Sequence, residues 1–197
     1  MCRAYSVDQL FTLLSAQGLL LQQDASLPNV VATVAGAPVH GSWWAHPRGH
    51  AIYDALNALS EHPDVLRTRL VHGKVTFVHR RLWPAVLAVG QSQAAWQFFR
   101  LSDPARALFE LVQRQGLLLS SGKSVKELEQ RLLAHGHQIH TDAGRHAIRL
   151  ESWSAWAERV GCQTALTPGA GQQALEGALQ ALGGTAATLP WPPGSTG

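Results

Sequence analysis

The side chains best suited to chemistry form a cationic stretch in the first half of the chain. Residues 65–102 contain six of the sixteen Lys and Arg residues and no Asp or Glu. The whole chain carries a formal charge of +3, so subtracting these six cations leaves −3 for the remainder. A block of one sign on a mildly acidic chain is suited to contact with a polyanion. The cations are Arg67, Arg69, Lys74, Arg80, Arg81 and Arg100.

The same stretch predicts a β-hairpin followed by a helix. Residues 66–71 and 75–79 are rich in β-branched and aromatic side chains, which favour strands. Gly73 and Lys74 between them suit a two-residue type II′ turn, in which glycine takes the position with positive φ. Apolar side chains then recur at helical spacing over residues 82–99.

A two-residue turn determines which side chains of the hairpin share a face. It pairs Leu70 with Phe77 on a mainly apolar face, and the opposite face carries Arg67, Arg69 and Arg80. One interpretation is a solvated face that keeps the protein soluble; the other is a wing that lays cations along a phosphate backbone. A solubilising surface normally mixes both signs, so the absence of acids favours the wing.

Two groups of histidines could ligate a metal. In the first group, His46 precedes Pro47 outside the expected helix, and no Cys or carboxylate completes a ligand set. The second group lies on a predicted hairpin whose alternation separates its members. We therefore expect no metal at either group and favour contact of the second with solvent or nucleic acid. The groups are His40, His46 and His50, and His135, His137, His140 and His146.

The pair Trp43-Trp44 has two interpretations. Adjacent aromatics usually pack in a core, but they can also stack on an unpaired base, here with Arg48 close by. In the second case Ser42, Trp43 and His46 would form the base pocket. Ser42 lacks the Gly-x-Ser-x-Gly turn of a hydrolase nucleophile, so no catalytic residue is assigned.

The tripeptide at 122–124, Gly-Lys-Ser, resembles the end of a phosphate-binding loop. The leading glycine of that motif would fall at position 117, which is Leu117, with Gly116 one residue away. A helix cap explains the tripeptide better than nucleotide hydrolysis does. We expect no cofactor.

Composition indicates a folded intracellular protein. The 197 residues are 46% hydrophobic and 15% charged and include seven Trp, enough for one large or two small cores. The two cysteines, Cys2 and Cys162, cannot form a disulfide framework, which favours a reducing cytosol. No signal peptide is evident, and no apolar run approaches the roughly 20 residues of a membrane span. We expect a cytoplasmic location without membrane contact.

The predicted elements repeat in the order helix, strand, helix, hairpin, over residues 6–81 and 102–151. A capping box is expected at Ser124 and Glu127, and Asp103 is expected to cap its helix. The tail from Gly183 is rich in Pro and Gly and is expected to be mobile. Predicted helices cover 6–17, 47–59, 82–99, 103–115, 125–134, 152–160 and 175–182; predicted strands cover 19–22, 29–34, 66–71, 75–79, 117–119, 138–141 and 146–150.

This element order resembles tandem winged helix-turn-helix proteins. The stretches 42–47 (SWWAHP) and 73–84 (GKVTFVHRRLWP) also resemble an uncharacterised bacterial family to which we attach no activity. Tandem winged helices are similar to a class of bacterial alkylation-repair DNA glycosylases, although the Gln-x-Asp signature of that class is not evident here. The resemblance implies DNA binding at the level of the fold.

The sequence thus predicts an α+β protein of two winged helix-turn-helix-like modules. Residues 1–100 would form the module with the basic hairpin, 101–162 the second module, and 163–197 a short helix with a flexible tail. The expected partner is nucleic acid, in the first place duplex DNA. Its phosphates would contact Arg67, Arg69, Lys74, Arg80 and Arg81, with Arg48, Arg145 and Arg149 as supplementary contacts.

Two other functions stay open. A DNA repair enzyme would use the same surface to present a flipped or damaged base to the pocket near Trp43. A protein-interaction module would use its winged helices to form a homodimer. The interaction module would be favoured if the cations were buried against acids such as Asp54, Glu61 and Asp64.

Overall fold

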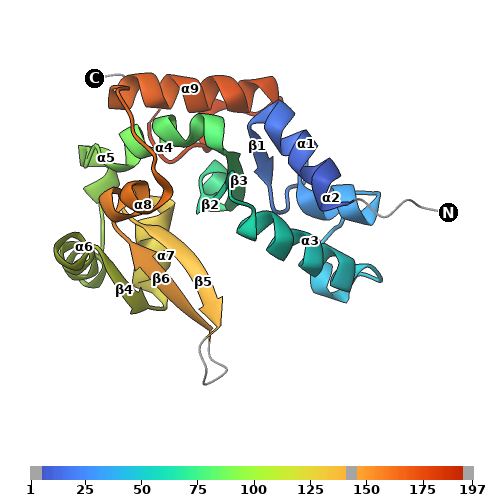
Figure 1. Ribbon diagram of the computed structural model, residues 1–197, viewed down its shortest axis with the longest axis horizontal. Coiled ribbons are helices and arrows are strands. Elements are labelled where there is room, and N and C mark those ends of the chain that lie inside the picture. The colour runs from blue at the N-terminus through green and yellow to red at the C-terminus, as the bar shows by residue number, and fades with distance from the viewer. Residues whose placement is uncertain (1–5, 141–145, 193–197) are drawn as a thin grey trace.

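The computed structural model describes residues 6–140 and 146–192. This part of the chain is α+β, with helices around two three-stranded antiparallel sheets, and the predicted fold class is confirmed (Figure 1). Each sheet belongs to a module of helices and a hairpin. No helix in the described ranges is long and apolar enough to cross a membrane.

The first module has three helices on one face of its sheet. Strand order is β1-β3-β2, and Phe77 of β3 packs into a core with α1, α2 and α3. Ser6 is the N-cap of α1 and forms a capping box with Gln9. The elements are α1 (Val7–Gln17), β1 (Leu19–Leu21), α2 (Val30–Ala35), α3 (Gly49–Glu61), β2 (Val65–Arg69) and β3 (Val75–His79).

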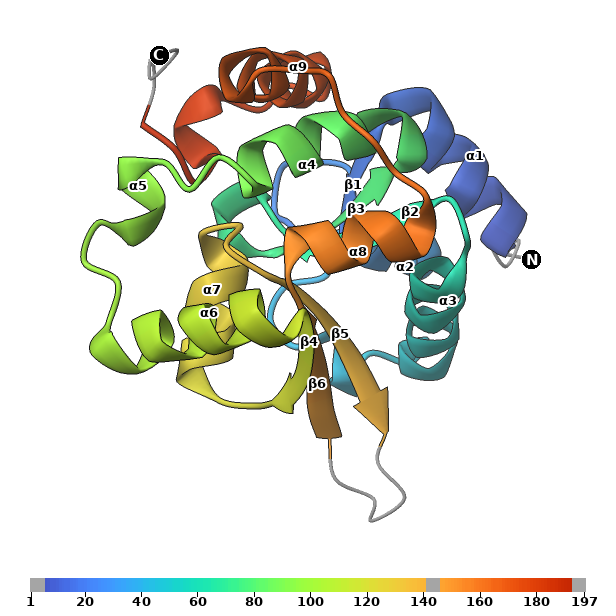
Figure 2. The ribbon, with the colours of Figure 1, turned by 60° about the vertical axis from the view of Figure 1, so that its left-hand side comes forward.

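The second module repeats this order with one helix fewer. Its strand order is β4-β6-β5, and its core centres on Phe109, Leu128 and Leu150. The hairpin β5–β6 extends away from the rest of the protein (Figures 1 and 2). The elements are α6 (Asp103–Gln115), β4 (Leu117–Ser120), α7 (Lys123–Gln130), β5 (His135–His140) and β6 (His146–Glu151).

Four further helices cover the second face of the first sheet and join the modules. Leu66 and Val78 of that sheet share a core with Val86 of α4, Trp156 of α8 and Leu175 of α9. Thus both faces of the first sheet are buried, as Figure 2 shows for α4 and α9. The helices are α4 (Trp83–Gly90), α5 (Ala95–Phe98), α8 (Trp153–Val160) and α9 (Pro168–Ala181).

Close packing of α4 on α9 depends on Gly171. A Cβ at this position would lie 2.7 Å from the carbonyl oxygen of Ala85, a contact that backbone atoms cannot relieve. Any larger residue would push the two helices apart, so this glycine sets the distance between them.

The strand predicted over 29–34 is wrong, because these residues form α2. Asn29 caps the helix, its Oδ1 accepting from the N–H of Ala32 at 2.8 Å. Val30, Val31 and Val34 predicted a strand through their β-branched side chains, but all three are buried on one helical face. Tertiary burial outweighs the intrinsic preference, and the first module gains the short second helix that the sequence did not indicate.

The predicted register of the first hairpin is also wrong. Arg67 pairs with Phe77 and Thr68 with Thr76, so Leu70 and Phe77 lie on opposite faces of the sheet. The loop is longer than two residues because a short 3-10 turn, η2 (Val71–Gly73), is inserted, with His72 at φ 54°. Arg67 and Arg69 still share a face, as expected from their spacing.

Three predictions on helix ends need correction. The helix expected over 82–99 is two helices, α4 and α5, separated by a break in which Gln93 has φ 47°. Ser102, not Asp103, caps α6, accepting from the N–H of Ala105 at 3.3 Å. The capping box at 124–127 is absent, because Glu127 accepts instead from the N–H and Oγ of Ser102, at 2.9 and 2.7 Å.

The tail is ordered as far as the structure describes it. Leu189 and Trp191 are buried in the shared core, and η4 (Ala186–Thr188) precedes them. The indole Nε1 of Trp191 donates to Glu176 Oε1 at 2.7 Å. The expected mobility is therefore wrong for residues 183–192, whose two large apolar side chains anchor the Pro-rich stretch.

We expect Trp191→Ala to lower the free energy of unfolding by roughly 3–5 kcal/mol, as for other buried Trp truncations. The change leaves a cavity in the shared core and removes the donor to Glu176. Urea denaturation followed by circular dichroism measures it. Trp44→Ala is the control, since Trp44 is 65% exposed, and should cost no more than about 1.5 kcal/mol of ring contacts. Equal midpoints for the two variants would contradict the anchoring of the tail.

Candidate nucleic-acid interface

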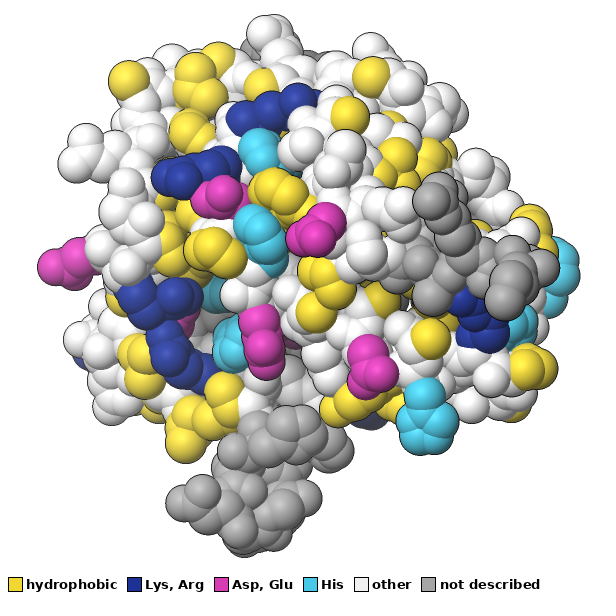
Figure 3. All heavy atoms as spheres, turned by 45° about the vertical axis from the view of Figure 1, so that its right-hand side comes forward, with side chains coloured by type: hydrophobic (Ala, Val, Ile, Leu, Met, Phe, Trp, Pro, Cys, Tyr) yellow, Lys and Arg dark blue, Asp and Glu magenta, His cyan; other side chains and the backbone are white. Residues whose placement is uncertain are grey.

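Three cations of the basic stretch form ion pairs with acids from outside it. Lys74 Nζ lies 2.7 Å from Asp24 Oδ2, and Arg80 Nη1 lies 2.8 Å from Asp64 Oδ1. Arg69 Nε lies 3.4 Å from Glu129 Oε2 in the second module. Half of the six cations of the predicted block are therefore paired with acids in the fold, and Figure 3 shows Lys and Arg in separate groups interspersed with Asp and Glu.

Other predicted contacts also have partners within the chain. Arg81 donates to the carbonyl oxygens of Ser15 and Ala16 at 2.6 and 3.0 Å, where a cation stabilises the C-terminal end of α1. Arg149 Nη2 lies 2.6 Å from Glu151 Oε1. Arg48 caps α3 through its backbone, and Arg145 lies outside the described residues.

Arg67 differs from these residues. Its guanidinium makes no hydrogen bond and no ion pair with any residue of the described ranges, although it is mostly buried. Burial lowers the pKa of Arg67, and the like charge of Arg69 adds to this, while Glu129 opposes it. Arginine stays protonated at neutral pH, so this is a charge held in a partly dry setting without a direct counter-ion.

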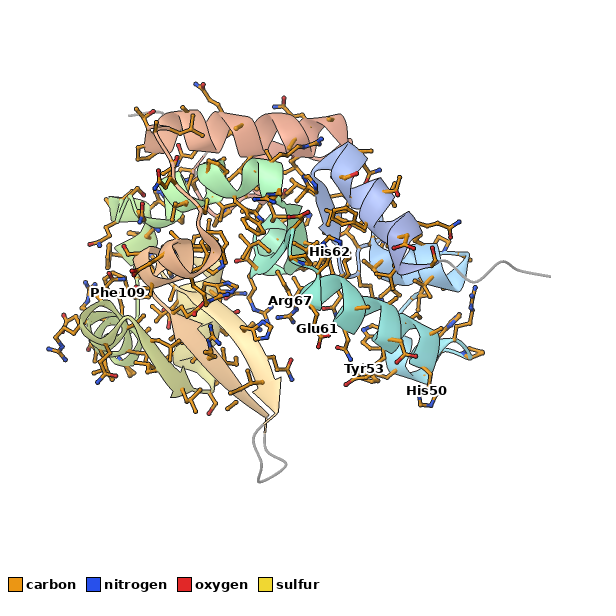
Figure 4. The ribbon with its side chains drawn as sticks, viewed as in Figure 1. His50, Tyr53, Glu61, His62, Arg67 and Phe109 are labelled. Atoms are coloured by element: carbon orange, nitrogen blue, oxygen red, sulfur yellow. The ribbon has the colours of Figure 1, made fainter. Side chains whose placement is uncertain are left out.

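Arg67 lies where the two modules meet (Figure 4). It contributes to the walls of three cavities, of about 620, 470 and 320 Å³. The largest, which we call the basic groove, also contains Arg69, Lys74 and His40. The structure thus brings three of the predicted phosphate contacts to one groove and leaves Arg80 and Arg81 outside it.

The second cavity, which we call the aromatic cavity, lies between α3 and β5. Its volume is about 470 Å³. Trp43 is buried and Trp44 is 65% exposed, and their rings stack with centroids 4.0 Å apart. Trp43 therefore packs in the core, as the first interpretation expects, and Trp44 presents an exposed ring. The lining residues are Gln22, Trp43, Trp44, Tyr53, Leu56, Asn57, Ser60, Glu61, Arg67, His137 and Gln138.

The predicted base pocket is only partly assembled. Of Ser42, Trp43 and His46, Trp43 alone lines the aromatic cavity. The Nδ1 of His46 instead accepts from the N–H of Arg48 at 3.1 Å, at the start of α3. This local hydrogen bond explains why a histidine precedes the helix.

Most residues that line the aromatic cavity were not assigned to a site from the sequence. Tyr53, Asn57 and Glu61 recur at intervals of four on α3, so the helical period could have placed them on one face. His137 comes from the other module, and no signal in the sequence brings it here. Burial lowers the pKa of His137, followed by the charges of Arg149 and Arg67.

In the part of the chain that the structure describes, the histidines do not gather into a metal site. Within residues 6–140 and 146–192, no three His, Cys, Asp or Glu side chains are grouped so that they could hold a metal. His135 is buried against Trp153 and Trp156, and this burial lowers its pKa to about 3, so it packs as a neutral ring.

Comparison with known proteins adds no relative. No protein-family model, no curated protein and no solved structure matches the chain.

The Lys74–Asp24 pair offers a direct test of the basic groove. The Asp24 side chain is 4% exposed. Burial opposes its ionisation, but hydrogen bonds from Lys74 and from the N–H groups of Ser26 and Leu27 outweigh burial and hold the pKa of Asp24 well below its usual range. Because the folded pKa is depressed, this stabilisation is complete above the ordinary value of 3.8 and is lost as the pH falls.

We expect Lys74→Met to cost about 1–3 kcal/mol of unfolding free energy at pH 7, because a buried carboxylate loses its cation. The difference from wild type should shrink as the pH falls below about 4. Urea denaturation across this pH range measures both effects. Arg80→Met is the matched control: its pair is exposed, and exposed pairs contribute about 0–1 kcal/mol. An equal cost for both variants would contradict the difference in burial.

Proposed function

We propose that this protein binds nucleic acid, in the first place duplex DNA, and that phosphates contact the basic groove. The observation that carries the proposal is Arg67, a mostly buried cation without a direct counter-ion, beside Arg69 and Lys74 in one groove. A phosphate oxygen can accept two hydrogen bonds from a guanidinium, which no carboxylate within the described chain does for Arg67.

The order of elements supports the same function. Both modules have the helix, strand, helix and hairpin order of winged helix-turn-helix proteins, and the antiparallel sheets have matching strand orders. The first hairpin is held between helices, whereas β5–β6 extends outward (Figure 2). A projecting hairpin beside a basic groove suits a duplex that is contacted at more than one point of its backbone.

The internal ion pairs are compatible with phosphate binding. The side chain of Lys74 is 48% exposed and that of Arg80 is 61% exposed. The Arg80–Asp64 pair is exposed and contributes roughly 0–1 kcal/mol, so a phosphate can replace Asp64. Lys74 can keep its bond to the buried Asp24 and donate its remaining N–H groups to a phosphate. Binding would then depend strongly on salt, since it exchanges counter-ions as well as internal partners.

Two observations support the alternatives. The Arg80–Asp64 pair is one of the contacts expected of a protein-interaction module, whose basic surface would be neutralised by its own acids. Glu61 lines the aromatic cavity with Trp43 and Trp44, and a carboxylate there could act as the acid or base of a repair enzyme. Release of a base from a damaged duplex, lost in Glu61→Gln, would support the enzyme.

Arg67→Gln should weaken duplex binding about equally for all sequences and reduce the salt slope of log K by about 1, because one phosphate contact is lost. Fluorescence anisotropy at several salt concentrations measures both. Arg114→Gln is the control, since Arg114 is an exposed cation in the last turn of α6. Arg80→Gln in the same series measures the contribution of the hairpin outside the groove. Unchanged affinity and slope for Arg67→Gln would overturn the groove as the phosphate site.

A further inference from the structure

The aromatic cavity contains a combination of groups that a phosphate contact does not use. Trp44 exposes 65% of its area and is among the most exposed large apolar side chains of the described residues. Its ring rests on buried Trp43 and lies 5.6 Å from the ring of Tyr53. The buried indole beneath it fixes the orientation of Trp44, so the cavity has a rigid aromatic wall.

Two polar side chains lie beside this wall on α3, the helix that also carries Tyr53. Asn57 and Glu61 are exposed, one helical turn apart on α3, and both line the cavity with Tyr53. An amide offers donors and an acceptor, while a carboxylate offers acceptors alone. A flat ring that stacks on Trp44 could therefore present a hydrogen-bonding edge to these two side chains.

Arg67 joins this cavity to the basic groove, because its side chain lines both. An aromatic ring on Trp44 and an anion at Arg67 would thus belong to one ligand or to neighbouring units of one chain. Nucleic acid has this arrangement, with a base and a phosphate in each unit. Stacking on aromatic side chains, polar contacts to the base edge and an adjacent cation are the features by which unpaired nucleotides are recognised.

We propose that the aromatic cavity holds an unpaired nucleobase stacked on Trp44, with the adjoining phosphate at Arg67. The volume of about 470 Å³ lies within the range of small-ligand sites and admits one base with its sugar. Glu61 favours bases whose edge presents N–H donors. The inference rests on the proposed function and specifies it: the preferred ligand is a duplex with an unpaired nucleotide rather than an intact one.

The test compares a labelled intact duplex with the same duplex carrying one extra, bulged nucleotide, by fluorescence anisotropy at fixed salt. We expect the bulged duplex to bind about tenfold more tightly, because one base gains a stacking partner. Trp44→Ala should remove this preference and leave the affinity for the intact duplex unchanged. Trp44→Phe should restore part of the preference, since the aromatic face returns.

Phe99→Ala is the matched control, because Phe99 is 64% exposed and does not line the cavity; it should keep the full preference. Urea denaturation of each variant verifies that it is folded. Equal binding of the two duplexes, or a preference that survives Trp44→Ala, overturns the base site and leaves the proposed function standing. Absence of binding to either duplex, at low salt as well, overturns the proposed function and the base site with it.

Discussion

Burial of the first sheet on both faces is the constraint on which the rest of the structure depends. Phe77 packs against α1, α2 and α3, while Leu66 and Val78 pack against the helices that join the modules. The start of the hairpin loop is buried as well, with Leu70 and Val71 inaccessible to solvent, while His72 and Lys74 at the tip are exposed. A hairpin held in this way cannot project as a wing. Arg67 and Arg69 lie on β2, the edge strand of this sheet, which contacts β5 and α7 of the second module.

Module docking then determines the electrostatics. Glu129 of α7 is buried beside β2, and burial raises its pKa, with Arg69 and Arg67 opposing this in part. Glu129 Oε2 accepts a hydrogen bond from Arg69 Nε, so Glu129 offsets the charge of Arg67 only at longer range. Glu129 thus lies near both Arg69 and Arg67 at the junction but pairs directly with Arg69 alone. The side chain of Arg67 lines the cavities.

Local signals in the sequence predicted much of the fold. The helical stripes over 6–17 and 152–160 correctly predict α1 and α8, and the structure shows Ser6 and Ser152 as their caps. The α2 helix was missed because its three valines favour a strand by intrinsic propensity, whereas their burial on one helical face stabilises the helix. The register of the first hairpin was missed because the inserted turn at 71–73 needs positive φ at His72 as well as at Gly73, and a histidine does not signal that conformation.

The candidate site was less predictable, for a physical reason. Counting charges along the chain identifies the cations but not their partners, and Lys74 and Arg69 pair with acids 50 and 60 residues away. The aromatic cavity needs α3 of one module and β5 of the other, so its composition follows from docking rather than from any local pattern. Tyr53, Asn57 and Glu61 share a helical face, but the same spacing also describes an ordinary solvated surface.

The position of Arg67 argues for binding rather than stability. A partly buried guanidinium that has no direct counter-ion among the described residues is less well solvated than an exposed one, and an apolar side chain of similar size at this position would cost the fold less. Other arginines of this protein do have carboxylate partners: Glu151 accepts from both Arg149 and Arg159. An anion at Arg67 would replace the water that burial removes and would contact both modules at their junction. Such a ligand stabilises the folded chain, and the stabilisation grows with the logarithm of its affinity. Binding would thereby offset the electrostatic cost of an unpaired Arg67.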